Sequence, residues 1–216
     1  MSTEAFGMGR LMRWALRYGM LPILVALELC GQAVAFGDAA VGNPAPDFIL
    51  TDTTGQSRSL SQWKGKVVVL EWSNHECPFV RKHYGSGNMQ RLQATYAKQG
   101  VGWLTILSSA PGKQGHVSPD QADALTKDRG AGPTAVLLDP DGTVGRRYGA
   151  KTTPHLFIID ANGMLAYAGA IDDRPSTDLA DVPGATNYVQ RALDELLAGR
   201  SVSTRSTKPY GCSVKY

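Results

Sequence analysis

A single cysteine stands in the segment SNHECPFVRKHY, residues 73–84, between an apolar run and a stretch of helical composition. Unpaired amides and the helix dipole favour negative charge where a helix begins, so the position of Cys77 predicts a lowered thiol pKa and a nucleophilic sulfur. Arg81 lies one helical turn later, where it would add a positive charge beside the sulfur. His75 and His83 are also close in sequence.

The partner of Cys77 has to come from elsewhere in the chain. Val80 occupies the position where a Cys-x-x-Cys pair would have its second thiol, and the candidate is Cys212 near the C-terminus. The tail that carries Cys212 can span roughly 40 Å when extended, at about 3.3 Å per residue. Such a thiol would condense with a sulfenic acid on Cys77. The alternative is two unrelated cysteines, one buried and one exposed.

The segment TTPHLFII supplies a third candidate element. It puts Pro154 at the start of a predicted strand, directly after Thr153, whose backbone can face a cleft. We predict that a cis bond between these two residues shapes the site opposite Cys77, and an ordinary proline at a strand start is the alternative.

Residues 1–35 differ in composition from the rest of the chain. Three arginines precede a short apolar stretch at 19–29, and the tripeptide AVA at 33–35 has the small-x-small pattern of a cleavage site. This pattern predicts a signal peptide and an exported, periplasmic protein; the alternative is an uncleaved anchor holding the protein at the membrane, facing the periplasm. Cleavage would remove Cys30 and leave two thiols in a compartment where disulfides persist.

Strands and helices that alternate along the chain would position these residues. Apolar runs rich in β-branched residues predict buried strands at 66–72, 101–109 and 134–139. Helices are predicted over 78–98, with an interruption at 85–88, and over 118–130 and 187–198. Two hairpins are predicted, one at the N-terminal end of the domain from residue 41 and one formed by 154–160 and 163–171. The pattern indicates an α/β fold with a central mixed sheet flanked by helices.

Three segments, VGNPAPDFILTDTTGQSRSLSQWKGKVVVLEWSNHECP, TTPHLFIID and GMLAYAGAIDD, resemble the thioredoxin-fold superfamily. Within it, they are similar to the redoxin or peroxiredoxin-like branch, which includes alkyl hydroperoxide reductase and thiol-specific antioxidant proteins. The resemblance implies a thioredoxin-like domain over 36–199 with an N-terminal β-hairpin extension, followed by a tail over 200–216. It also implies that Cys77 is the reactive cysteine and Pro154 the cis-proline.

The chain departs from true peroxiredoxins at two positions near the cysteine. Asn74 stands where that family has a threonine, and Leu70 where it has a proline. The amide of Asn74 can still donate a hydrogen bond to a peroxide. The arginine that the family contributes from a later strand has three candidates, Arg146, Arg147 and Arg174.

The leading hypothesis from the sequence is an exported thiol-dependent oxidoreductase that reduces peroxides. Cys77 would attack, Arg81 and Asn74 would support the thiolate, and Cys212 would resolve the sulfenic acid. The substrate would be a peroxide or a disulfide, an external thiol would supply electrons, and no cofactor is expected. The first alternative is thiol–disulfide exchange through a mixed disulfide with a partner.

Other classes of function are also open at this point. His75, Cys77 and His83 could bind copper, and a binding module without turnover is the remaining alternative. The net charge is only +3 and the basic residues are scattered, which excludes a nucleic-acid partner. The sequence is compatible with an oligomer.

Overall fold

The computed structural model describes residues 38–216. The predicted signal peptide at 1–35 lies outside the described residues, so cleavage and export stay predictions. None of the helices between residues 38 and 216 has the length and hydrophobicity needed to span a bilayer.

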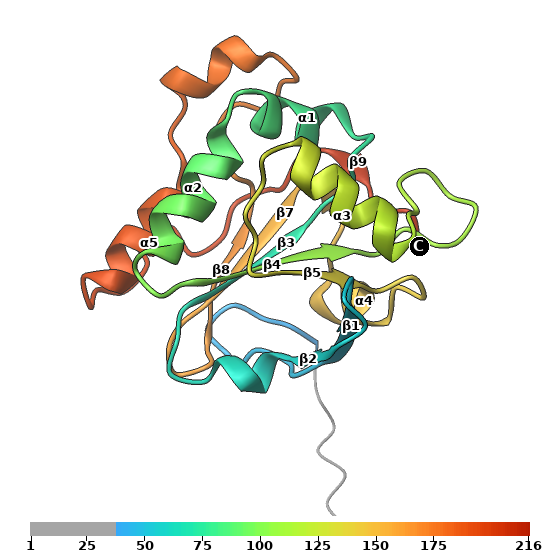
Figure 1. Cartoon of the computed structure of the whole chain (residues 1–216). Helices are drawn as coiled ribbons and strands as arrows, with labels where there is room; N and C mark the ends of the chain where they lie inside the picture. The colour runs from blue at the N-terminus through green and yellow to red at the C-terminus, as the bar shows by residue number, and fades with distance from the viewer. Residues whose placement is uncertain (1–37) are drawn as a thin grey trace, which may run out of the picture. The chain divides into compact units, whose positions relative to one another are not determined.

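Seven strands form a mixed sheet in the order β2-β1-β5-β4-β3-β7-β8, as predicted for the fold class (Figure 1). Strands β3, β4 and β5 run parallel, whereas β7 is antiparallel to β3 and β8 to β7. The N-terminal hairpin is present, since β1 pairs antiparallel with β2 and also with β5. The strands are β1 (Ile49–Asp52), β2 (Ser57–Ser59), β3 (Val68–Trp72), β4 (Gly102–Leu107), β5 (Ala135–Leu138), β7 (His155–Ile159) and β8 (Leu165–Gly169).

Helices cover both faces of this sheet. The α-helices are α1 (Pro78–Gly85), α2 (Asn88–Ala97), α3 (Pro119–Asp128), α4 (Thr143–Tyr148) and α5 (Tyr188–Leu197), and the 3-10 helices are η1 (Leu60–Trp63) and η2 (Leu179–Gly184). Helices α1, α2 and α5 pack on one face with Val69 of β3, and α4 packs on the other with Val68 and Leu70. Adjacent residues of a strand point to opposite faces, so the continuous apolar run of β3 serves two cores.

Two local features bear on the helices. One explains where the predicted long helix is interrupted, and the other concerns helix α4, which the sequence does not predict. The helix predicted over 78–98 divides because Gly87 adopts a left-handed backbone (φ 72°), which favours glycine, between α1 and α2. Helix α4 was not predicted. Its N-terminal amides at Val144 and Gly145 donate to the side chain of Asp139, a cap that the folded loop places there.

The C-terminal tail, residues 200–216, lies against the domain instead of extending from it. A two-residue strand β9 (Cys212–Ser213) pairs antiparallel with β6 (Thr152–Thr153), and Cys212 is the register partner of Thr153. Figure 1 shows the tail, in red, returning from α5 to the end of the sheet where α1 begins. No pattern in the sequence predicts this pairing.

Candidate active site

Cys77 lies at the end of a short loop that connects β3 to α1. Its backbone is extended (φ −70°, ψ 122°), and Pro78 occupies the first position of α1, where no amide partner is needed. The amide of Cys77 donates to the carbonyl of Asn74 at 3.1 Å, and its own carbonyl accepts from Arg81 at 2.9 Å. The predicted order of strand, cysteine, proline and helix is therefore present, and it fixes the sulfur at the N-terminus of α1.

The tail brings Cys212 directly to Cys77. The two sulfurs are 2.8 Å apart, and both residues are free thiols. A disulfide requires about 2.0 Å between the sulfurs, so a small approach would close the bond. The Cys77 sulfur also lies 2.9 Å from the carbonyl oxygen of Thr153, and the Thr153–Pro154 bond is cis. Cys77 has no exposed surface. Cys212 of the tail and the carbonyl of Thr153 both contact its sulfur.

The two thiols have opposite acid–base character. Burial raises the pKa of Cys77, but hydrogen bonds from the Cys212 thiol and from the amides of Val80 and Cys212 outweigh it and leave the pKa below its ordinary value. Burial and the adjacent Cys77 sulfur raise the pKa of Cys212 to about 11. Cys77 is therefore the thiolate of the pair, and Cys212 keeps the proton.

We expect this difference to appear in a titration of the reduced protein. A lowered pKa means that Cys77 ionises at lower pH than a free cysteine, whose pKa is about 8.5. In a Cys30→Ser background, thiolate absorbance should thus rise with a midpoint below that of a free cysteine, and Cys77→Ser in the same background should lack this rise. In Cys212→Ala the midpoint should move upward, because the thiol that donates to Cys77 is gone. An unchanged midpoint would mean that Cys212 does not stabilise the thiolate.

Arg81 and Asn74 are placed differently from the sequence-based assignment. Arg81 is exposed, its Nε donates to the carbonyl of His75 at 3.2 Å, and it is not among the largest contributions to the pKa of Cys77. Asn74 is buried; its Oδ1 accepts from the amide of Glu76 at 2.9 Å and its Nδ2 donates to the carbonyl of Gln114 at 3.4 Å. Both side chains therefore hold the loop before Cys77, and neither supports its sulfur directly.

The candidate copper ligands do not converge. His83 is buried, with Asn88 on one ring nitrogen and Tyr210 on the other, whereas His75 is only partly buried. Within residues 38–216, no group of three or more His, Cys, Asp or Glu side chains is arranged to hold a metal ion. The structure therefore offers no support for the copper hypothesis.

The three arginines considered for a catalytic role contact other groups. Arg146 stacks on the ring of Tyr216, with 4.6 Å between the guanidinium carbon and the ring centre. Arg147 donates to the carbonyl of Asp47 at 3.0 Å, and Arg174 pairs with Asp173 at 3.7 Å. None of these recorded contacts is with a cysteine of the site.

Gly211 is a site residue that sequence reasoning missed. A Cβ placed on Gly211 would lie 2.1 Å from the carbonyl oxygen of Thr153, far closer than atoms can approach. The backbone is also at φ 147°, which a side chain disfavours. Glycine therefore allows the tail to reach Thr153. The only signal in the sequence is the glycine directly before Cys212.

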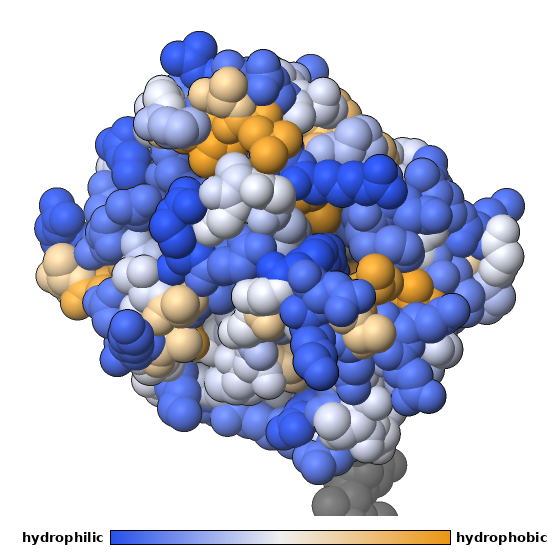
Figure 2. All heavy atoms as spheres, turned by 45° about the horizontal axis from the view of Figure 1, so that its top comes forward, coloured by the Kyte–Doolittle hydropathy of each residue, from blue (hydrophilic) through white to orange (hydrophobic). Residues whose placement is uncertain are grey.

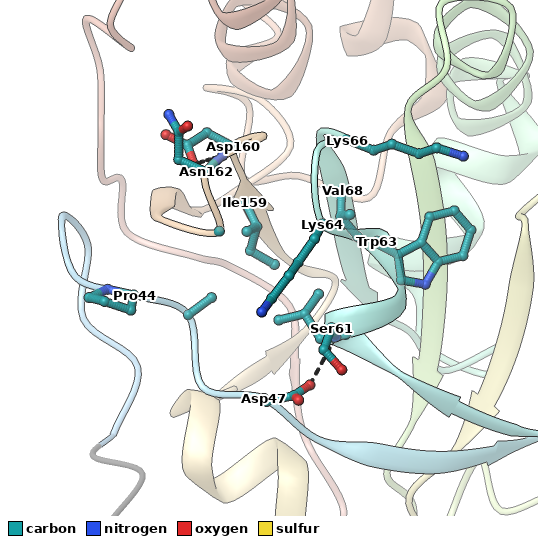
Figure 3. Close-up of a pocket in the computed structure, with 13 residues that line it drawn as sticks. Pro44, Asp47, Ser61, Trp63, Lys64, Lys66, Val68, Ile159, Asp160 and Asn162 are labelled. Atoms are coloured by element: carbon teal, nitrogen blue, oxygen red, sulfur yellow. Dashed lines mark hydrogen bonds between the residues drawn. The ribbon is translucent and has the colours of Figure 1, made fainter. Parts of the chain in front are cut away.

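Two hollows in the surface of the described residues are lined by neither Cys77 nor Cys212. A groove of about 610 Å³ lies next to the loop of His75 and Glu76, between residues 112–117 and α3. A second pocket, of about 300 Å³, lies at the other end of β3, where Val68 and Ile159 form its floor and Lys64 extends across it (Figure 3). The face that carries α1 is largely hydrophilic, with small separate hydrophobic patches (Figure 2).

Comparison with known proteins gives matches over most of the domain. The sequence profile of the AhpC/TSA family matches residues 41–168. The thiol-disulfide oxidoreductase ResA of Geobacillus thermodenitrificans is 31% identical over 149 residues, which cover 68% of this chain and 80% of ResA. An uncharacterized conserved protein from Geobacillus kaustophilus superimposes with a TM-score of 0.70 at 29% identity, covering 82% of this chain and 92% of that one. A protein from Chlorobium tepidum, assigned as the thiol:disulfide interchange protein DsbE, gives a TM-score of 0.50 at 29% identity, covering 60% and 84% of the two chains.

Proposed function

Because the chain belongs to the AhpC/TSA family and is a thiol-dependent oxidoreductase, we propose that it catalyses thiol–disulfide exchange with Cys77 as nucleophile and Cys212 as resolving thiol. The observation that carries this proposal is the 2.8 Å separation of the two sulfurs across 135 residues of sequence. The tail thereby supplies the second thiol that Val80 cannot. The functions given in the names of ResA and DsbE support the same reaction class.

The first step is attack on a disulfide of a partner molecule, for which the tail that contacts the buried Cys77 sulfur has to move aside. The Cys77 thiolate forms a bond to one partner sulfur, and the bond between the two partner sulfurs breaks. The departing sulfur leaves as a thiolate and takes a proton from solvent. The lowered pKa of Cys77 raises the fraction of attacking thiolate near neutral pH.

The second step is resolution by the tail. Cys212 loses its proton, attacks the Cys77 sulfur of the mixed disulfide and releases the second partner sulfur as a thiol. The negative charge on Cys77 is one cause of the raised pKa of Cys212, and the mixed disulfide removes that charge. Cys212 therefore becomes easier to ionise when it is needed. The partner ends as a dithiol and this chain as a Cys77–Cys212 disulfide, which an external thiol reduces.

Exchange replaces peroxide reduction, the leading hypothesis from the sequence, as the favoured function. Asn74, which stands in the position of the peroxiredoxin threonine, has its amide engaged with Gln114. The recorded hydrogen-bond partners of the Cys77 sulfur are Cys212 and Thr153. An exported location, with residues 1–35 as a signal peptide, is part of the proposal because disulfides persist in such compartments.

Oxidised glutathione tests the proposal directly. We expect the reduced full-length chain to form an intramolecular Cys77–Cys212 disulfide, detected by mass spectrometry of unreduced peptides. Cys212→Ser should instead accumulate glutathione on Cys77, because the resolving thiol is missing, and Cys77→Ser should show little modification of Cys212 near neutral pH. Glutathione found mainly on Cys212 would contradict the assigned roles. Faster loss of the Cys77 thiol with hydrogen peroxide than with oxidised glutathione would restore the peroxidase hypothesis.

A further inference from the structure

A cluster of buried polar side chains lies beside α1 and takes no part in the two exchange steps. Lys82 and His83 belong to α1, Asn88 to α2, Asp172 follows β8, and Tyr210 belongs to the tail. The side chain of Lys82 is 0% exposed and that of Asp172 2%. The Lys82 ammonium lies 3.7 Å from Asp172 Oδ2, so two opposite charges are buried together. Burial of such a pair is costly unless its remaining hydrogen-bonding groups are satisfied.

A directional chain of hydrogen bonds passes through Tyr210. Asn88 Nδ2 lies 3.1 Å from His83 Nδ1, and His83 Nε2 lies 3.1 Å from the Tyr210 hydroxyl. Burial lowers the pKa of His83 to about 4, so the ring is neutral at pH 7. Because Nδ1 accepts from Asn88, the ring proton is on Nε2, which donates to Tyr210. The Tyr210 hydroxyl in turn donates to Asp172 Oδ1.

Side chains of α1 contact the ring of Tyr210 as well as its hydroxyl. The ring of Phe79 meets it edge-on with 5.8 Å between ring centres, and the Lys82 ammonium lies 5.6 Å from its centre. Phe79, Lys82 and His83 all belong to α1, the helix that begins directly after Cys77. Tyr210 is thus attached to the same rigid element that carries the nucleophile.

Tyr210 precedes the resolving thiol by two residues. Between them, Gly211 lies against the carbonyl of Thr153, and Cys212 then pairs with Thr153 in the two-stranded sheet. Beyond the site the tail is held again by Tyr216, whose hydroxyl donates to the carbonyl of Ala150 at 2.8 Å. Cys212 therefore lies on a short span between two anchors, and Tyr210 is the anchor nearer in sequence.

We propose that Tyr210 is a positioning residue for exchange, held by Lys82, His83 and Asp172 so that it keeps Cys212 at Cys77. This inference rests on the proposed function, because it concerns how fast and how completely the tail thiol resolves a mixed disulfide. The anchor sets the effective concentration of Cys212 at the Cys77 sulfur. Loss of the anchor lets the tail separate from α1 for part of the time.

The test is the equilibrium of the full-length chain with mixtures of reduced and oxidised glutathione. We expect Tyr210→Phe, which loses only the hydroxyl, to lower the effective concentration of Cys212 roughly tenfold, because a hydrogen bond to a buried charged group is lost. Tyr210→Leu, which also loses the ring contacts, should lower it further. In a Cys212→Ser background, Tyr210→Phe should speed alkylation of Cys77 by a similar factor.

Tyr96→Phe is the matched control. The hydroxyl of Tyr96 in α2 donates to Asp194 Oδ1 in α5 at 2.6 Å, so this variant also loses a bond from a tyrosine to a carboxylate, but one that involves neither Tyr210 nor Cys212. Its urea midpoint should fall while its glutathione equilibrium stays within twofold of the wild type. Equilibria within twofold of the wild type for both Tyr210 variants would overturn the inference. A wild type that forms no Cys77–Cys212 disulfide would instead overturn the proposed function.

Discussion

Replacing Lys82 by methionine is expected to lower the free energy of unfolding of the reduced protein by about 3–5 kcal/mol. Methionine fills most of the same volume but removes the charge that faces Asp172. The carboxylate then keeps the Tyr210 hydroxyl and the Arg174 amide as donors but loses the lysine charge that faced it. A buried carboxylate without a cation is far less stable than a buried pair, so the loss is large for one substitution.

Urea denaturation at pH 7 measures this loss. Lys98→Met, at an exposed lysine after α2, is the control and should change stability by less than about 0.5 kcal/mol. The double variant Lys82→Met/Asp172→Asn should recover much of the loss, because it buries no unpaired charge. A loss below about 1 kcal/mol in Lys82→Met would contradict the reasoning and mean that the buried carboxylate of Asp172 does not depend on the charge of Lys82.

Replacing Gly211 by alanine is expected to lower the effective concentration of Cys212 at Cys77 by at least about a hundredfold. The added methyl group would meet the Thr153 backbone at 2.1 Å from the oxygen and 2.7 Å from the carbonyl carbon. Overlap with backbone and a disfavoured φ each cost on the order of 1–3 kcal/mol, and about 1.4 kcal/mol corresponds to a factor of ten. The tail strand relieves both by leaving Thr153, because Thr153 is held through Pro154 to β7 of the seven-stranded sheet, whereas the tail strand pairs only with β6.

The same glutathione equilibrium measures this effect. Gly184→Ala is the matched control, because a Cβ at Gly184 meets nothing within 4 Å and its backbone is not left-handed. Circular dichroism should show that Gly211→Ala keeps its fold, since Gly211 lies outside the seven-stranded sheet. If Gly211→Ala forms the Cys77–Cys212 disulfide as readily as the wild type, then the close approach of the tail to Thr153 does not control the position of Cys212.

The sequence alone was sufficient to predict most strands of the sheet and the start of α1. Apolar β-branched runs form β3, β4 and β5, and the turn between the runs at 154–160 and 163–171 gives the antiparallel pair β7 and β8. Helix α4 has six residues, with Gly145 inside it and glycines at both caps, so it is too short and too rich in glycine to show a helical pattern. Periodicity and turn residues predict an element only where it is long enough to display them.

The residues of the site also fall into two groups: those that the sequence predicts and those that only the folded structure brings together. Cys77 was identifiable as a nucleophile because strand, cysteine, proline and helix follow one another directly, and the local backbone alone places a sulfur at a helix N-terminus. The same helical spacing suggested that Arg81 supports the thiolate, yet the Arg81 side chain turns to the carbonyl of His75. The meeting of Cys77 with Cys212 depends on β9 pairing with β6 and on Tyr210 entering a buried cluster of residues from α1 and Asp172. These contacts join residues that are 38 to 135 positions apart, so the path of the whole chain, which only the tertiary structure reveals, decides them.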